Sequence, residues 1–248
     1  MAFVMAPKRR MVSVSLSMWV VLSLVGCGGS TQDVSSDQDI DLISVLKSRS
    51  EAASRVRPFD SISDVLANTR YRVAGQPPRP LTEAVVVGRF TDSTAGRGFS
   101  VTGEDAPAGD EVDFEDPDAL WRTVHASLEV EEVISGSLES SNTLVGLALN
   151  PDVPLDEVSA DLKAMGRVVV FLHRTPVFAY DPSVYGILLD GGLLGTLAGD
   201  AIRLPILDDS EESALLSGAA TLDHLRRAAE RPDVVVEVDR NGQARDEK

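Results

Sequence analysis

Three histidines are the side chains of this sequence best suited to hold a metal ion or to move a proton at neutral pH. His125, His173 and His224 lie about 50 residues apart, so a metal triad would need three distant segments to meet. Local context favours separate positions, because His125 falls on the polar side of an alternating stretch, His173 follows an apolar run and His224 lies in a predicted helix. We therefore expect no shared metal site and no cofactor.

Acidic side chains crowd the segment 91–119, which is predicted to be a long loop. Calcium prefers roughly six to eight oxygen ligands, but the acids lack the spacing of an EF-hand, so a solvated acidic loop is the simpler explanation and calcium the alternative. A loop of this length is uncommon without a role, which makes it the first candidate binding surface. The acids are Glu104, Asp105, Asp110, Glu111, Asp113, Glu115, Asp116 and Asp118.

Motifs for catalysis are absent from the sequence. There is no G-x-S-x-G, no G-x-x-x-x-G-K-[ST], no H-E-x-x-H and no pair of cysteines, and Gly96-Arg97-Gly98 lacks the third glycine of a dinucleotide fingerprint. Acid catalysis by paired carboxylates stays open as an alternative, since acids are abundant. It would require two carboxyl groups roughly 5 to 10 Å apart in a cleft.

The N-terminus has the pattern of an export signal. Lys8, Arg9 and Arg10 precede an apolar run over 11–25, which is shorter than the roughly 20 residues of a spanning helix. The run ends in Leu24-Val25-Gly26-Cys27, which resembles the lipobox of bacterial lipoproteins. This resemblance implies cleavage after Gly26, a diacylglycerol on Cys27, and a position on the extracytoplasmic face of the cell membrane. The alternative is an ordinary secretory signal with a chance cysteine.

Composition excludes other classes of function. The chain has 39 acids, 23 bases and a formal charge of −16, and loss of the three cations of residues 1–26 would make it −19. Such a charge excludes nucleic acid as a partner, because phosphate binding relies on clustered cations. The single cysteine excludes a disulfide within the chain.

Hydrophobic periodicity predicts the elements of the body. Strands are expected at 84–88, 144–149 and 168–172, and at 123–130, where Val124, Ala126, Leu128 and Val130 face the core and Thr123, His125, Ser127 and Glu129 face water. A bulge at Glu131-Glu132 would return Val133 to the core. Helices are expected at 151–165 and 211–231, the second broken at Gly218, with a β-hairpin around Asp190-Gly191-Gly192. Short helical pieces at 40–46 and 61–68 precede them, and 234–236 adds an edge strand.

The order of several strands, one helix and more strands predicts a mainly β (α+β) fold, a small OB-like β-barrel of five to six strands with peripheral helices. The segments EAVVVGRF, LEVEEVISG, GRVVVFL and GILLDGG resemble largely uncharacterised secreted bacterial domains with an OB-like or netrin-like barrel, over roughly residues 60–230. This resemblance implies a fold and no functional residues. The expected organisation is a signal peptide at 1–26, Cys27 and a flexible tether to 58, the barrel at 59–238, and a disordered tail at 239–248.

These observations predict a membrane-anchored cell-envelope lipoprotein. Its barrel is expected to act as a noncatalytic binding or scaffolding module for a small ligand or an envelope protein. The alternative function is an envelope hydrolase that uses paired carboxylates.

Overall fold

The computed structural model describes residues 42–53, 59–100, 109–207, 209–218 and 220–238. All of them belong to one of the two compact units of the chain, Asp39–Lys248. The predicted signal peptide, Cys27, the polar tether over 28–39 and the C-terminal tail over 239–248 lie outside the described residues. Within them, no helix is both long enough and apolar enough to cross a membrane.

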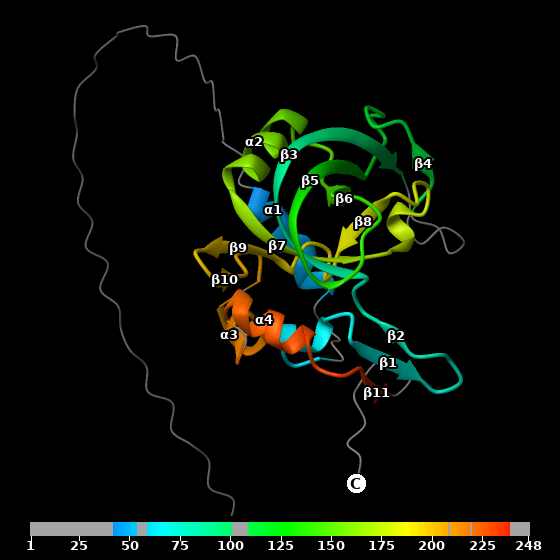
Figure 1. Ribbon diagram of the computed structural model, residues 1–248. Coiled ribbons are helices and arrows are strands. Elements are labelled where there is room, and N and C mark those ends of the chain that lie inside the picture. Colours follow the sequence, from blue (N-terminus) through cyan, green and yellow to red (C-terminus); the bar gives the residue numbers. More distant parts are fainter. Residues whose placement is uncertain (1–41, 54–58, 101–108, 208, 219, 239–248) are drawn as a thin grey trace, which may run out of the picture. The chain divides into compact units, whose positions relative to one another are not determined.

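Five strands of the main sheet pair in a ring (Figure 1). β3 pairs with β5, β5 with β6, β6 with β8, β8 with β7, and β7 again with β3. The pair β6–β8 is parallel and the other four pairs are antiparallel. This pattern is that of a small OB-like Greek-key barrel and confirms the predicted mainly β class. The five strands are β3 (Ala84–Phe99), β5 (Trp121–Gly136), β6 (Asn142–Leu149), β7 (Arg167–His173) and β8 (Val184–Ile187).

The ring of five strands agrees with the predicted barrel of five to six strands, and short strands extend the sheet to eight. β4 (Glu111–Val112) returns along the end of β3, while β9 (Leu194–Ala198) pairs with both β7 and β10 (Ala201–Arg203). The long strands β3 and β5 bend around the barrel through four register irregularities in their pairing.

Two hydrophobic cores lie on the two faces of β7. Its alternate residues Val168, Val170 and Leu172 enter the barrel core, and Val169 and Phe171 enter a second core outside the barrel. The second core joins the barrel to η1 (Ile62–Val65), α3 (Asp209–Leu216), α4 (Leu222–Ala229) and a three-stranded sheet, which lie below the barrel in Figure 1. That sheet has the order β11 (Val234–Val238), β1 (Thr69–Val73), β2 (Arg79–Pro80).

Helix α1 (Leu42–Ala53) corrects the predicted domain boundary. The sequence placed residues 27–58 in a flexible tether, yet Leu42 and Leu46 belong to the barrel core. The backbone amide of Leu42 also donates to Oδ2 of Asp161 in α2 (Leu155–Ala164) at 3.1 Å. The barrel domain therefore begins before residue 59.

Local signals in the sequence are confirmed at the helix ends. Ser61 caps η1 through a capping box with Asp64, and the predicted terminal helix is broken between α3 and α4, around Gly218.

The predicted hairpin around Asp190 is wrong. β8 and β9 do not pair with each other; both pair with β7, at the edge opposite β3. The edge of β8 that a hairpin partner would need is occupied by β6. The predicted return of Val133 to the core is also wrong, since irregularities on both sides of it leave its side chain 44% exposed.

Candidate ligand-binding site

A row of four residues crosses the outer face of the barrel. His125 of β5 lies opposite Gly146 of β6, Gly146 opposite Gly186 of β8, and Gly186 opposite His173 of β7. Two histidines thus flank two glycines on one surface. Their Cα atoms are three strand spacings apart, about 14 Å, which is too far for both rings to bind one metal ion.

The two glycines leave room for η2 (Pro176–Phe178), which follows β7 and covers this row. A Cβ atom on Gly146 would lie 2.4 Å from Cζ of Phe178, and one on Gly186 would lie 2.7 Å from Cγ2 of Thr175. Thr175 caps η2 by accepting from the amide of Val177. Phe178 is therefore the side chain that packs against Gly146.

A cavity of about 190 Å³ lies beside η2. Apolar and aromatic side chains form most of its wall, including Trp121, Val177, Phe178 and Ile187. Its polar side chains are those of His173, Thr175 and Asp190. Cavities with apolar walls and a few polar groups are the usual form of a small-molecule site.

His173 is a neutral imidazole in this wall. Burial lowers its pKa below the usual range for histidine, while the charge of Asp190 and a hydrogen bond with the backbone of Ile187 oppose that shift. A neutral ring carries one donor and one acceptor nitrogen. The bond to the Ile187 backbone uses the donor nitrogen, which leaves the acceptor nitrogen of His173 for a ligand without contributing charge.

The segment that holds Asp190 has a strained backbone. Leu189 and Asp190 have φ angles of 60° and 47°, and Gly191 follows with 103°. The left-handed region costs a leucine more than it costs glycine or aspartate, so surrounding contacts must hold this turn. Strain of this kind concentrates at binding and catalytic sites.

His125, at the other end of the row, belongs to a polar network rather than to the cavity. Its Nε2 lies 2.8 Å from the hydroxyl of Tyr180, which lies 2.7 Å from Oγ1 of Thr123. Burial lowers the pKa of His125 and raises that of Tyr180, so both are neutral at pH 7. Thr123 Oγ1 also accepts from the Arg97 amide at 2.7 Å, where the β3–β5 register shifts. The network therefore fastens the segment after η2 to the barrel.

Stacked aromatic rings support the cavity wall. Phe99 and Trp121 stack with centroids 4.0 Å apart and an interplanar angle of 6°. Tyr180 lies beside this pair, 6.2 Å from the Phe99 ring and 6.4 Å from that of Phe178. The aromatic side chains thus link the ends of β3 and β5 to the segment around η2.

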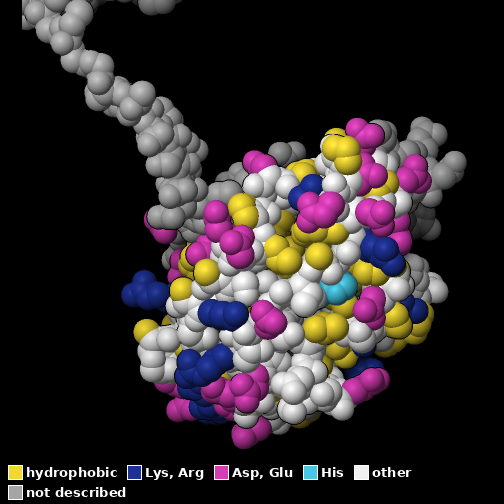
Figure 2. Space-filling view, turned by 90° about the horizontal axis from the view of Figure 1, so that it is seen from above, with side chains coloured by type: hydrophobic (Ala, Val, Ile, Leu, Met, Phe, Trp, Pro, Cys, Tyr) yellow, Lys and Arg dark blue, Asp and Glu magenta, His cyan; other side chains and the backbone are white. Residues whose placement is uncertain are grey.

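The acidic segment 91–119 is not one long loop. Residues 91–99 continue β3, and β4 pairs with its end, so the connection is shorter than predicted. Glu104 and Asp105 lie outside the described residues, and Asp116 accepts from the amide of Asp118. Figure 2 shows acidic side chains spread among hydrophobic ones. Within the described part of the chain, no three His, Cys, Asp or Glu side chains form a group able to hold a metal.

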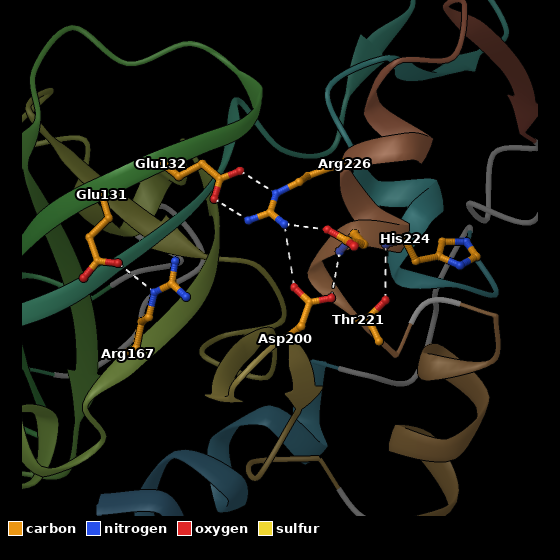
Figure 3. Close-up of polar contacts among 8 residues, drawn as sticks. Glu131, Glu132, Arg167, Asp200, Thr221, His224 and Arg226 are labelled. Atoms are coloured by element: carbon orange, nitrogen blue, oxygen red, sulfur yellow. Dashed lines mark hydrogen bonds and ion pairs between the residues drawn. The ribbon is translucent and has the colours of Figure 1, made fainter.

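Carboxylates do gather around Arg226, but as an ion cluster (Figure 3). Both oxygens of Glu132 lie 2.7 Å from the guanidinium, which also pairs with Asp223 at 2.7 Å and Asp200 at 3.7 Å. The hydrogen bond from Arg226 lowers the pKa of Glu132, whereas a general acid needs a raised one. The ring of His224 points away from this cluster in Figure 3.

Sequence reasoning named His173 as a candidate residue but missed the other side chains of the site. It named none of Trp121, Phe178 and Tyr180, and it placed Asp190 only in a turn. Thr175-Pro176 was a usable signal, since a threonine before proline marks the start of a helical turn. In comparisons with known proteins, no family model, no curated protein and no solved structure matches this chain.

Proposed function

We propose that this chain is a lipid-anchored lipoprotein of the bacterial cell envelope whose OB-like barrel binds a small ligand without catalysis. The observation that carries the binding role is the cavity beside η2, on the outer face of β5, β6 and β8. OB-folds bind ligands on the face of their second and third strands, between the loops that follow the first and fourth strands. β5 and β6 hold those positions here, so the location supports binding by analogy of fold.

The cavity wall suggests the chemistry of the ligand. Trp121 and Phe178 offer apolar surface, while His173, Thr175 and Asp190 offer hydrogen bonds at one side. Asp190 is the one charged side chain of the lining, so a ligand with a hydrogen-bond donor or a positive charge beside an apolar body fits best. The volume of about 190 Å³ suits a small metabolite or a single side chain of an envelope protein.

The positions of the carboxylates favour binding over acid–base hydrolysis. A paired-carboxylate hydrolase needs two acids in one cleft with different pKa values. Only Asp190 among the cavity residues is an acid, and the carboxylates around Arg226 share that one cation. We therefore infer a binding module without catalytic residues.

The lipid anchor rests on the sequence Leu24-Val25-Gly26-Cys27. Two or more acyl chains hold a protein stably on a membrane, whereas one holds it marginally. Cys27→Ala should release the protein from washed membranes, and Ser30→Ala, a change in the same region, should leave it bound. Retention of the Cys27→Ala protein on membranes would contradict the anchor.

A thermal melt against a panel of small metabolites and cell-wall fragments tests the binding role. A compound that binds only the native state adds about 2.7 kcal/mol at a hundredfold excess over its Kd. We expect a hit whose shift disappears in His173→Gln and persists in His224→Gln, because only His173 lines the cavity. Shifts that are equal in both variants would place the ligand elsewhere.

A further inference from the structure

The C-terminal strand β11 presents a free edge. Among the described residues it pairs with β1 alone, and the amide of Val234 donates to Asn68 on that side at 2.9 Å. Successive residues of a strand direct their backbone groups to opposite edges, so Val235 and Glu237 turn theirs away from β1. The side chains of Val234 and Val235 are 52% and 44% exposed.

A second cavity, of about 300 Å³, lies beside this strand and is separate from the cavity beneath η2. Val234 and Val236 form its wall on β11, and Tyr71 lies next to them on β1. The remaining wall includes Asp60 and Asp64, at the start of the described segment after α1. A side chain from a strand added to the edge of β11 would therefore have a hollow to enter.

The polar side-chain atoms around this cavity are mostly closed to a ligand. Asn68 donates through Nδ2 to the carbonyls of Ala228 and Arg231, and its Oδ1, like Oγ of Ser63, is buried without accessible surface and has no hydrogen-bond partner among the described residues. The hydroxyl of Tyr71 is already used, since it donates to the backbone oxygen of Asp64 at 3.0 Å. Selection of a ligand in this cavity therefore rests on its charge rather than on these atoms.

The charge of the cavity favours a cationic group. Burial is the largest cause of the raised pKa of Tyr71, and the charges of Asp64 and Asp60 raise this pKa further. Both carboxylates therefore act on the Tyr71 hydroxyl. Arg231 is the one basic residue of the lining and lies exposed. An ammonium or guanidinium group would complement the charges of Asp60 and Asp64.

We propose that β11 and this cavity bind an extended segment of a partner protein by strand addition, with a Lys or Arg side chain of that segment in the cavity. Main-chain hydrogen bonds to Val235 and Glu237 would supply affinity, and the charges of Asp60 and Asp64 would select the basic residue. A second copy of this chain is a poorer occupant. It would bring the same acidic cavity and a formal charge of −16 against an equal charge.

The first experiment measures binding of two capped peptides to the full 248-residue chain by isothermal titration calorimetry. One peptide is Thr-Val-Lys-Val-Thr-Val and the other carries Glu in place of Lys. We expect saturable binding of the Lys peptide and at least about tenfold weaker binding of the Glu peptide, because charge-assisted hydrogen bonds are the stronger ones. Equal affinities, or no binding of the Lys peptide, would overturn the proposal.

Matched variants test the edge and the cavity separately. Val235→Pro removes an outward amide that β1 does not use, and proline is tolerated on edge strands, so the fold should persist while Lys-peptide binding weakens at least about tenfold. Val235→Thr keeps the amide and should bind within about twofold of the wild type, since threonine suits strands. Asp60→Asn, which removes one charge at the cavity, should weaken binding about threefold or more. Unchanged binding by Val235→Pro would overturn strand addition.

Two further outcomes assign the site to another occupant and overturn the proposal. Arg55 and Arg57 precede Phe59 in the sequence. If peptide binding appears only in the Arg55→Ala/Arg57→Ala protein, the chain's own arginines occupy the cavity. If sedimentation shows a dimer that Val235→Pro dissociates, and the Lys peptide does not bind, a second copy occupies the edge.

Discussion

Replacement of Leu46 by alanine tests whether α1 is a structural part of the barrel. The Leu46 side chain is 1% exposed and lies in the barrel core with Leu42, next to Gly191. Truncation of a buried leucine costs about 2 to 5 kcal/mol, and the lower half applies where the surroundings can relax. Because α1 packs against the barrel, it can shift toward the space that the removed side chain leaves. We therefore expect a loss of about 3 kcal/mol in the free energy of unfolding.

The assay is urea unfolding followed by far-ultraviolet circular dichroism, together with a thermal melt. For a domain of this size, a loss of about 3 kcal/mol lowers Tm by roughly 6 to 12 °C. Leu120→Ala is the matched control, since the Leu120 side chain is 58% exposed. Its free energy of unfolding should change by less than about 0.5 kcal/mol.

A loss below about 1 kcal/mol in Leu46→Ala would refute this reasoning, because a buried leucine cannot be removed so cheaply. The helix would then lie outside the folded core, and the flexible tether would reach residue 58, as the sequence predicts. A loss of the expected size would establish that the folded domain starts near residue 42.

Other substitutions probe the site and its supports. Gly146→Val would place its side chain against the ring of Phe178, which should cost about 1 to 3 kcal/mol and abolish any ligand-induced rise in Tm, both measured by thermal melts. A double-mutant cycle of Glu132→Gln and Arg226→Gln should give a coupling energy of about 0.2 to 1 kcal/mol, because both groups are about a third exposed. Since the folded pKa of Glu132 is lowered, this coupling should be complete above the usual glutamate pKa, and be lost as pH falls through the folded value; coupling that strengthens in acid would contradict the sign. Ser61→Ala should cost about 1 kcal/mol in urea unfolding through loss of the cap on η1, and a neutral result would show that the cap contributes nothing.

Alternation in the sequence predicted much of β5 correctly, and its failure at Thr123 is instructive. Val124, Ala126 and Leu128 are buried as expected. Thr123 was assigned to water, yet its side chain is fully buried. At the bulge in β3, the Thr123 hydroxyl accepts a hydrogen bond from the Arg97 amide in place of a strand-to-strand backbone bond, and Tyr180 covers it. The alternation along a strand predicts on which face of the sheet a residue lies, but it does not predict which distant segment covers that face.

The candidate site was harder to predict than the fold for the same reason. Its row of residues exists only through the pairings β5–β6–β8–β7, and the parallel pair in that order cannot be read from local patterns. The sequence instead predicted a hairpin at Asp190, because Asp-Gly-Gly is a strong turn signal. The turn is present with its positive φ angles, but it joins two strands that share a neighbour. The predicted turn was therefore correct, and the predicted pairing of the two strands that flank it was wrong.

The pairing of β1 with β11 joins Thr69 to Val234, which places segments 165 residues apart in one sheet. β1 cannot complete its hydrogen bonds until the residues of β11 are available to pair. Contacts between such distant residues also slow folding, since a long loop must close first. This part of the domain would thus stay incompletely folded until the residues of β11 are available to pair.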